Sequence, residues 1–256
     1  MKTITSRQNE IFKRVRLALR EHVHEIVIEG PKQVADAMAT GWQPISLIYR
    51  SRIADREPRA VAFSSQLFDA LAETKSAQNV IALFERPAFT LKDVFKRQDT
   101  IVVALDGVQD PGNVGTIVRL AAAFDCGGVA LLPGCADPYS PKSIRASAGA
   151  VLSVPIVRTT AAGLMGTGLP MFAAEARGAT AEPPPKAAII VFGSEGAGLS
   201  EEIRGAATPI SVRMSPGIES LNVAAAAAIL LSRSFEARLE GGGKPPQSKA
   251  LRGRHE

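Results

Sequence analysis

Three loop segments in the second half of the chain combine glycine with polar side chains that could bind a ligand or move a proton. They are DGVQDPGNVGTIVRLAAAF at 106–124, VFGSEGAGLS at 191–200 and PISVRMSPGIESLNVAAAAAILL at 209–231. Each follows or faces the carboxyl end of a predicted strand, which is where open α/β sheets place their ligands. We therefore expect the three segments to meet at one edge of a sheet.

The first segment offers Asn113 and Arg119. Asn113 stands at the entrance of a predicted helix, where an ordinary N-cap is the alternative role. Arg119 is the only charged residue from Val114 to Phe124. Burying an unpaired charge is expensive, so we expect a dedicated partner for this guanidinium, with a plain surface arginine as the alternative.

The second segment places Ser194 and Glu195 among three glycines. It matches neither GxSxG nor a Walker motif, and no GxGxxG occurs, so hydrolase, P-loop and dinucleotide-binding fingerprints are missing. Residues 98–240 contain no histidine, which disfavours a Ser-His-Asp mechanism. The alternative is a glycine-rich turn before a helix capped by Ser200.

The third segment runs from a strand into Ser220, Leu221 and Asn222, followed by an alanine-rich helix. We expect Ser220 to be the N-cap of that helix. Asn222 then has no structural purpose and becomes a candidate functional residue.

Strands and helices alternate through residues 98–240, which predicts an open, mostly parallel sheet. The continuous apolar run Ile101 to Leu105 is typical of a strand buried on both faces. Further strands are expected at Gly128–Leu132, Pro155–Ile156, Met171–Ala174, Ile189–Phe192 and Ile210–Val212, and helices at Val114–Phe124, Lys142–Ala150 and Leu221–Leu239.

Residues 1–97 form a smaller predicted α/β unit that ends in a polar linker, Ala88 to Asp99. Its first helix runs from Ser6, the expected N-cap, to Glu21, with Ile11, Val15 and Leu19 at helical spacing. Strands are expected at Ile26–Ile28, Ser46–Tyr49, Val61–Phe63 and Val80–Phe84, and further helices around Val34–Met38 and at Ser65–Glu73. The tail, 241–256, is expected to be disordered.

Charge is distributed unevenly along the 256 residues. Residues 1–97 carry 16 lysines and arginines against 11 acidic residues, a net charge of +5, whereas 98–240 carry a net charge of −3 and the tail +3. This pattern favours a polyanion held by the first part and chemistry in the second. Candidate RNA-phosphate contacts are Arg7, Lys13, Arg14 and Arg16; a solvated helix surface is the alternative.

The sequence argues against a membrane-spanning, a secreted and a metal-binding protein. The longest apolar run has nine residues, Val223 to Leu231, whereas a membrane span needs about 20. The N-terminus lacks the apolar core of a secretory signal. Two cysteines suggest a reducing cytoplasm. Three histidines without CxxC or HExxH make a metal site improbable.

Together, the three segments resemble the SpoU/TrmH family of RNA ribose 2′-O-methyltransferases, in the SPOUT superfamily. The resemblance covers nearly all of residues 98–240. The family's first motif matches through Asn113 and Arg119, the second through GSEG with Glu195, and the third through Ser220 to Val223. Residues 1–97 resemble, more loosely, the family's substrate-binding domain. Arg213 replaces a usual proline, and Ser215-Pro216-Gly217 departs from the usual loop.

The resemblance implies a C-terminal sheet with a trefoil-knotted methyltransferase fold, a small N-terminal α/β RNA-binding domain and S-adenosylmethionine (SAM) as cofactor. Gly193, Val212 and Leu221 would line the cofactor, with Leu132 and Pro133 as weaker candidates. The family also implies a homodimer, here through the helices Val114–Phe124 and Leu221–Leu239.

The implied reaction is methylation of a ribose hydroxyl in RNA. Arg119 would activate the hydroxyl or clamp a phosphate, while Asn113, Glu195, Ser220 and Asn222 orient Arg119, the RNA and the loops. The separate N-terminal module favours ribosomal RNA. A transfer-RNA methyltransferase and a non-catalytic RNA-binding or ribosome-assembly protein are the alternatives. We expect no metal, DNA or membrane partner and a cytoplasmic location.

Overall fold

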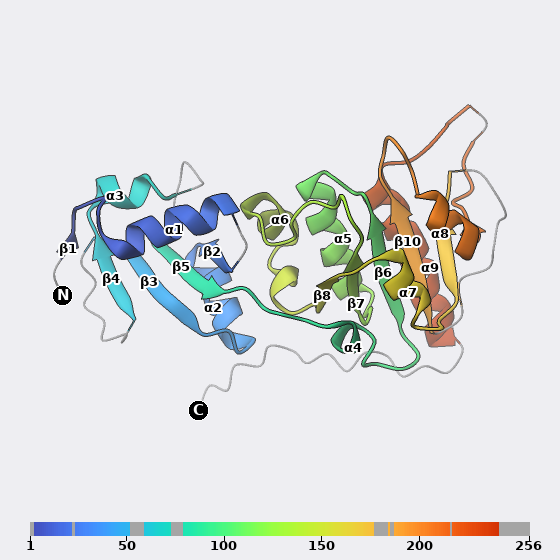
Figure 1. Ribbon diagram of the computed structural model, residues 1–256, viewed down its shortest axis with the longest axis horizontal. Coiled ribbons are helices and arrows are strands. Elements are labelled where there is room, and N and C mark those ends of the chain that lie inside the picture. Colours follow the sequence, from blue (N-terminus) through green and yellow to red (C-terminus); the bar gives the residue numbers. More distant parts are fainter. Residues whose placement is uncertain are drawn as a thin grey trace. The chain divides into compact units, whose positions relative to one another are not determined.

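The chain divides into two compact units, which are described separately here (Figure 1). The first comprises Met1–Pro87 with Tyr139–Arg145, and the second Ala88–Pro138 with Ala146–Glu256. The computed structural model describes residues 3–21, 24–51, 59–72, 79–176, 184, 187–215 and 217–240. The predicted disordered tail therefore lies outside the described residues. Within them, no helix is long and apolar enough to cross a membrane.

The first unit contains a mixed sheet of five strands in the order β1-β4-β3-β5-β2. Strand β4 pairs in parallel with β1 and β3, and β5 pairs antiparallel with β2 and β3. The strands are β1 Thr3–Ile4, β2 Glu25–Glu29, β3 Pro44–Arg50, β4 Ala60–Phe63 and β5 Val80–Glu85, and the helices are α1 Glu10–Glu21, α2 Pro31–Ala39 and α3 Ser65–Asp69.

Helix α1 begins later than its sequence suggests. Asn9 caps it, because its Oδ1 accepts hydrogen bonds from the backbone N–H groups of Ile11 at 3.0 Å and Phe12 at 3.4 Å. The predicted cap, Ser6, was wrong: its hydroxyl accepts from Gln8 in the preceding turn. Serine and asparagine are both good caps, so propensity could not choose between them. The buried face of α1 consists of Phe12, Val15 and Ala18.

A segment from the second half of the sequence completes the first unit. Tyr139, just before α6 (Pro141–Ala146), is buried. Its ring lies 6.4 Å from that of Trp42, and the Arg86 guanidinium carbon lies 4.8 Å from its centroid. A contact between segments so far apart in sequence has no local signature.

The second unit is built on a six-stranded sheet whose pairs are all parallel, as predicted. The order is β11-β9-β10-β6-β7-β8, so β8 and β11 are the edge strands. The strands are β6 Ile101–Asp106, β7 Gly128–Leu131, β8 Ile156–Arg158, β9 Met171–Ala174, β10 Ala188–Gly193 and β11 Thr208–Ile210. The predicted last strand, Ile210 to Val212, is thus displaced toward the N-terminus.

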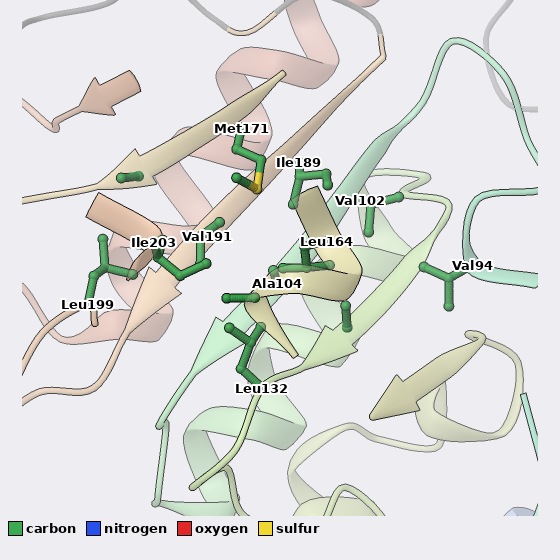
Figure 2. Packing of buried hydrophobic residues seen from close by; sticks show 13 residues of the cluster. Val94, Val102, Ala104, Leu132, Leu164, Met171, Ile189, Val191, Leu199 and Ile203 are labelled. Carbon is green, nitrogen blue, oxygen red and sulfur yellow. The ribbon is translucent and has the colours of Figure 1, made fainter. Parts of the chain in front are cut away.

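Helices cover both faces of this sheet. The long helices α5 (Pro111–Ala123) and α9 (Val223–Glu240) pack against each other, with α5 on β6 and β7 and α9 on β10. The opposite face buries an apolar cluster to which α4 (Leu91–Val94), α7 (Ala161–Met165) and α8 (Glu201–Ala206) contribute. Figure 2 shows Leu164 of α7 lying near Ala104 of β6 and Leu132, which directly follows β7, in this cluster.

Short helices account for most differences from the predicted elements. Helix α4 lies inside the predicted linker, where Thr90 and Asp93 form a reciprocal capping box; α7 was not predicted. The predicted helix Lys142–Ala150 is divided into α6 and a 3-10 turn at Ala150–Leu152, separated by Gly149 with φ 88°. Helices of four to six residues are too short to show an apolar period.

The strand order determines where polar loops can gather. From β6 the chain proceeds outward to β7 and β8, whereas β10 flanks β6 on its other side. The carboxyl ends of β6 and β10 therefore form a topological switch point, where the two following connections diverge and leave a crevice. The segments 106–124 and 191–200, which follow β6 and β10, leave the sheet at this point.

An ion-pair cluster joins Arg97, ahead of β6, to the end of α9 through Asp125. Arg97 donates from both terminal nitrogens to the Asp125 carboxylate at 2.7 Å, and Arg238 near the end of α9 donates to it at 3.0 Å. Although burial alone would raise the pKa of Asp125, the hydrogen bonds and charges of the two arginines hold that pKa below its usual value.

Asp125→Asn should therefore lower the free energy of unfolding at pH 7 by about 1–2 kcal/mol, because it removes charge-assisted hydrogen bonds. A carboxyl with a lowered folded-state pKa stabilises the fold above its unfolded pKa, and this contribution disappears as pH falls through the folded value. Urea unfolding at pH 7 and pH 3 should show the difference from wild type shrinking in acid. Asp99→Asn, an exposed change nearby, is the control; an equal loss there would contradict the assignment.

Candidate functional site

Asn113 lies in the first turn of α5, not at its cap. Asp110 is the N-cap, and its carboxylate accepts a hydrogen bond from the backbone N–H of Asn113 at 3.0 Å. The N-cap alternative for Asn113 is thereby excluded. Its side-chain amide instead donates a hydrogen bond to Oε1 of Glu195, 82 residues later in the sequence.

Glu195 sits at the tip of a tight turn that follows β10. Backbone hydrogen bonds of 3.0 and 3.1 Å join Ser194 and Gly198 in both directions, and the Ser194 hydroxyl accepts from the N–H of Ala197 at 3.2 Å. A side-chain carbon at Gly193 would overlap the backbone of Gly198 and Leu199. The glycines of this segment thus permit a close backbone approach that presents Glu195.

Asp106, which the sequence analysis missed, ties this turn to the neighbouring strand. It is the last residue of β6, it is buried, and its Oδ2 accepts a hydrogen bond from the backbone N–H of Ser200 at 2.7 Å. Ser200 does occupy the N-cap position of α8, but its hydroxyl makes no cap bond. A carboxylate directly after a buried apolar strand was the signal that could have revealed Asp106.

Asn222 caps α9, a role that the sequence analysis assigned to Ser220. Its Oδ1 accepts from the backbone N–H groups of Ala224 at 2.9 Å and Ala225 at 3.3 Å. Its Nδ2 donates to Oδ1 of Asn113 at 3.3 Å. Ser220 is exposed, and its side chain forms no hydrogen bond with the described part of the chain. The helix begins two residues later than predicted, so the expected cap was wrong.

These contacts form one row of hydrogen bonds across all three segments, from Asn222 to Asn113 to Glu195. Each amide uses its nitrogen as donor and its oxygen as acceptor, so the orientation of one sets that of the next. The expectation that the three segments meet is confirmed for these residues. The second carboxylate oxygen of Glu195 forms no hydrogen bond to any described residue and can accept one from a ligand.

A pocket of about 720 Å³ opens beside this row. Gly193, Val212 and Leu221, predicted from the family resemblance as cofactor residues, line it. Leu132 lies in the buried cluster of the sheet, and Pro133 is exposed; neither is among the lining residues. The apolar part of the wall comes from Phe192, Leu199, Val212, Met214, Leu221 and Leu230.

The charged side chains of the pocket are mostly acidic. Glu175, Glu195 and Glu219 line it, against a single described cation, Arg204. Arg204 pairs with Glu175, with Nε and Oε1 3.3 Å apart. An apolar wall with an excess of carboxylates suits a ligand that has an apolar or aromatic body and carries positive charge.

Arg119 lies away from this row. It is exposed on α5 and forms no hydrogen bond or ion pair with the described residues. Six residues separate it from Asn113, which is about 9 Å along the helix axis and about 240° around it. Arg119 therefore has no partner among the described residues of its own chain, and its exposure removes any burial penalty. The expected partner at the reaction centre stays a prediction.

The four predicted RNA contacts differ in their surroundings. Lys13 pairs with Glu10 at 3.0 Å, and Nε of Arg14 donates to Glu25 at 2.6 Å, which raises the pKa of Arg14. Arg7 and Arg16 are exposed and make no ion pair with described residues.

Metal and thiol chemistry find no support in the described residues. No group of three histidine, cysteine or acidic side chains is arranged there to hold a metal ion. Cys126 and Cys135 are free, and burial raises the pKa of both thiols, that of Cys126 to about 12. Both thiols are protonated at neutral pH and therefore poor nucleophiles.

Comparison with known families decides the relationship. Residues 100–232, which include all three segments, match the family described as SpoU rRNA Methylase. The chain belongs to the SpoU rRNA methylase family. The matched region lies mostly in the second unit, and the resemblance stated from the three motifs is confirmed.

Individual members of the SpoU family are similar over most of their length. The 23S rRNA (uridine(2479)-2′-O)-methyltransferase of Streptomyces viridochromogenes is 28% identical, covering 87% of this chain and 86% of its own. The 23S rRNA (guanosine(2553)-2′-O)-methyltransferase RlmP of Bacillus subtilis is 30% identical, covering 82% and 79%.

Solved structures of the family agree with the fold. The S. viridochromogenes SpoU methyltransferase AviRb in complex with AdoMet has a TM-score of 0.81 at 25% identity, covering 91% of this chain and 99% of its own. An AdoMet-bound rRNA methyltransferase from Sinorhizobium meliloti has a TM-score of 0.80 at 29% identity, covering 93% and 98%.

The two roles of Asn222 can be separated by substitution. Asn222→Ala removes the cap and should lower the free energy of unfolding by about 1 kcal/mol, whereas Asn222→Asp keeps the capping oxygen and should cost much less. Ser220→Ala is the matched control and should change stability by less than about 0.5 kcal/mol. Urea unfolding measures all three; a loss at Ser220 equal to that at Asn222 would restore Ser220 as the cap.

Proposed function

We propose that this protein is a SAM-dependent methyltransferase that methylates a ribose 2′-hydroxyl in ribosomal RNA. The observation that carries the proposal is the row Asn222–Asn113–Glu195, which joins three family motifs at the edge of one pocket. The named relatives that act on 23S rRNA support the reaction and the substrate class.

SAM fits the pocket by size and chemistry. Val212 and Leu221 would hold it through apolar contacts, and its sulfonium and ammonium charges suit a wall with more carboxylates than cations. Neighbours solved with AdoMet support the same cofactor. Arg213, which replaces the usual proline, is exposed and is not itself a lining residue, although Val212 and Met214 on either side of it are.

When bound, SAM supplies an electrophilic methyl group; the protein must hold the ribose hydroxyl in line with it and remove the hydroxyl proton. Glu195 presents an unengaged carboxylate oxygen at the pocket edge, which can accept a hydrogen bond from the ribose. Asn113 holds Glu195, and Asn222 holds Asn113. Ser220 lines the pocket and can contact the RNA. Arg119 would orient the hydroxyl or clamp the adjacent phosphate bidentately.

A homodimer would bring Arg119 to the site. Helices α5 and α9 pack together within one chain, and small residues on both are exposed: Ala122 and Ala123, one turn after Arg119 on α5, and Ala225 on α9. Such residues suit close helix packing against a second copy. Because Arg119 is remote from its own Asn113, we infer that it serves the partner's site.

The remaining proposals concern substrate binding, topology and location. Residues 1–97, with their net charge of +5, would supply most of the RNA affinity. Deletion of the basic tail 241–256 is the control that measures the contribution of the tail to RNA binding. The trefoil knot stays a proposal from the family resemblance. Two free thiols favour the reducing cytoplasm.

The reaction is tested by labelled-methyl transfer from SAM to a 23S rRNA transcript, followed by digestion to nucleosides. A 2′-O-methylnucleoside is the expected product. Base-methylated nucleosides alone would overturn the reaction. SAM binding without any transfer to ribosomal or transfer RNA would favour the non-catalytic alternative, whereas transfer only to transfer RNA would change the substrate.

Arg119→Ala should reduce the transfer rate at least about 100-fold, as expected for loss of a group that acts at the reaction centre, while SAM affinity and the circular dichroism spectrum are unchanged. Arg119→Lys keeps the charge but loses the planar fork. Appreciable activity of the lysine variant would indicate a phosphate clamp, whereas near-complete loss would indicate a geometric role at the hydroxyl. Wild-type turnover of Arg119→Ala would remove it from the mechanism.

Mixing Arg119→Ala with Glu195→Gln tests the shared site. If Arg119 acts across the dimer, each mixed dimer contains one intact site, and an equal mixture should recover about a quarter of wild-type activity. If Arg119 acts within its own chain, every site in the mixture carries a defect. Absence of recovery, with subunit exchange verified by native mass spectrometry, would therefore contradict the shared arrangement.

A further inference from the structure

We propose that one face of α1, formed by Arg16, Leu17 and Arg20, is the RNA-backbone contact of the first unit. This inference rests on the proposed function and deepens it, because it identifies where that unit holds its substrate. It also changes the set of residues expected from sequence: Leu17 and Arg20 enter it, whereas Lys13 and Arg14 of the same helix, and Arg7 ahead of it, leave it.

The cations of α1 fall into two groups that the sequence cannot distinguish. Arg14 is bound to Glu25 of β2, and Lys13 is bound to Glu10. Arg16 and Arg20 are exposed and form no ion pair within the described residues. An arginine already paired with a carboxylate presents less net positive charge to a phosphate than an unpaired arginine does. The free positive charge of α1 is therefore at Arg16 and Arg20.

Helical geometry brings these two arginines to one face. Arg16 and Arg20 are four residues apart, so their side chains lie one above the other, about 5–6 Å apart at Cβ. Leu17 is three residues before Arg20, so these two side chains are also neighbours on the helix surface. The row can thus approach consecutive phosphates of one RNA strand.

Leu17 adds an exposed apolar side chain to this face of α1. Its side chain is 53% exposed, whereas the apolar residues Phe12, Val15 and Ala18 on the opposite face of α1 are buried. Between two phosphate-binding cations, an apolar side chain can pack against the ribose that links the phosphates. Charge complementarity thus favours RNA over a protein surface as the occupant.

The face is held rigidly. Phe12 and Val15 are anchored in the core cluster with Ile48, Phe63 and Phe68, and Asn9 caps the start of the helix. A preformed helix face loses little conformational entropy when it binds. Contacts to phosphate and sugar fix the register of an RNA without reading its sequence, so this face would position the substrate while the second unit chooses the nucleotide.

The experiment measures the affinity of the full-length protein for a 23S rRNA transcript between 50 and 200 mM salt, conditions over which phosphate contacts weaken strongly. Arg16→Gln and Arg20→Gln should each reduce the slope of log affinity against log salt by about 1, and the double variant by about 2. Leu17→Ser should weaken binding while leaving the slope unchanged, because it removes no charge.

Arg14→Gln is the matched control, since it removes the same charge from the same helix but from a residue already paired with Glu25. It should leave the salt slope at its wild-type value. Equal slopes for Arg14→Gln and the Arg16/Arg20 double variant would overturn the proposed face, as would unchanged RNA affinity of the double variant. Circular dichroism and SAM binding verify that the variants are folded.

The failure of this inference and the failure of the proposed function are distinguishable. If wild-type protein methylates RNA but the double variant binds RNA normally, the face is wrong and the reaction stands. If wild-type protein binds SAM and no RNA at any salt concentration, the proposed function itself is overturned, and with it this inference.

Discussion

An ionised Glu195 carboxylate can accept hydrogen bonds but cannot donate them. This restriction sets the direction of the other polar contacts in the site. Its carboxylate fixes the Asn113 amide with nitrogen toward Glu195, which turns the Asn113 oxygen toward Asn222. The Asn222 oxygen is then directed to the backbone N–H groups at the start of α9. A neutral group at position 195 could also donate, and the whole row would lose its single orientation.

The parallel sheet makes this arrangement possible. Strands β6 and β10 are neighbours, so the connections after them begin side by side although they are far apart in sequence. Asp106 reinforces the junction, because it holds the backbone of Ser200 at the far end of the turn that carries Glu195. The rigid part of the site is thus made by buried strands, and the polar side chains are added at their ends.

The sequence predicted the fold class well because continuous apolar strands and long helices have strong periodic patterns. The strands around β6 and β10, and the helices α5 and α9, were found to within a few residues. The row Asn222–Asn113–Glu195 was predicted as a set of residues but not as contacts, because hydrogen-bond partners across 82 and 109 residues depend on tertiary packing. Asp106 was missed because its hydrogen bond with Ser200 joins residues 94 positions apart. The cap at Asn222 was missed because serine and asparagine are both good N-cap residues, so propensity could not choose between Ser220 and Asn222. Arg119 is exposed, not buried as its apolar neighbours suggested, because a helix with mostly apolar residues still has one side facing solvent.

Helix α9 is held by side-chain hydrogen bonds at both of its ends. Its first turn is held by Asn222 beside the pocket, and its last turn is held by Arg238, which binds the same carboxylate as Arg97, ahead of the first strand of the second unit. The position of the pocket wall therefore depends on a residue at the opposite end of an 18-residue helix. A shortened chain that ended before Arg238 would keep every motif residue and still release one end of the element that supports them.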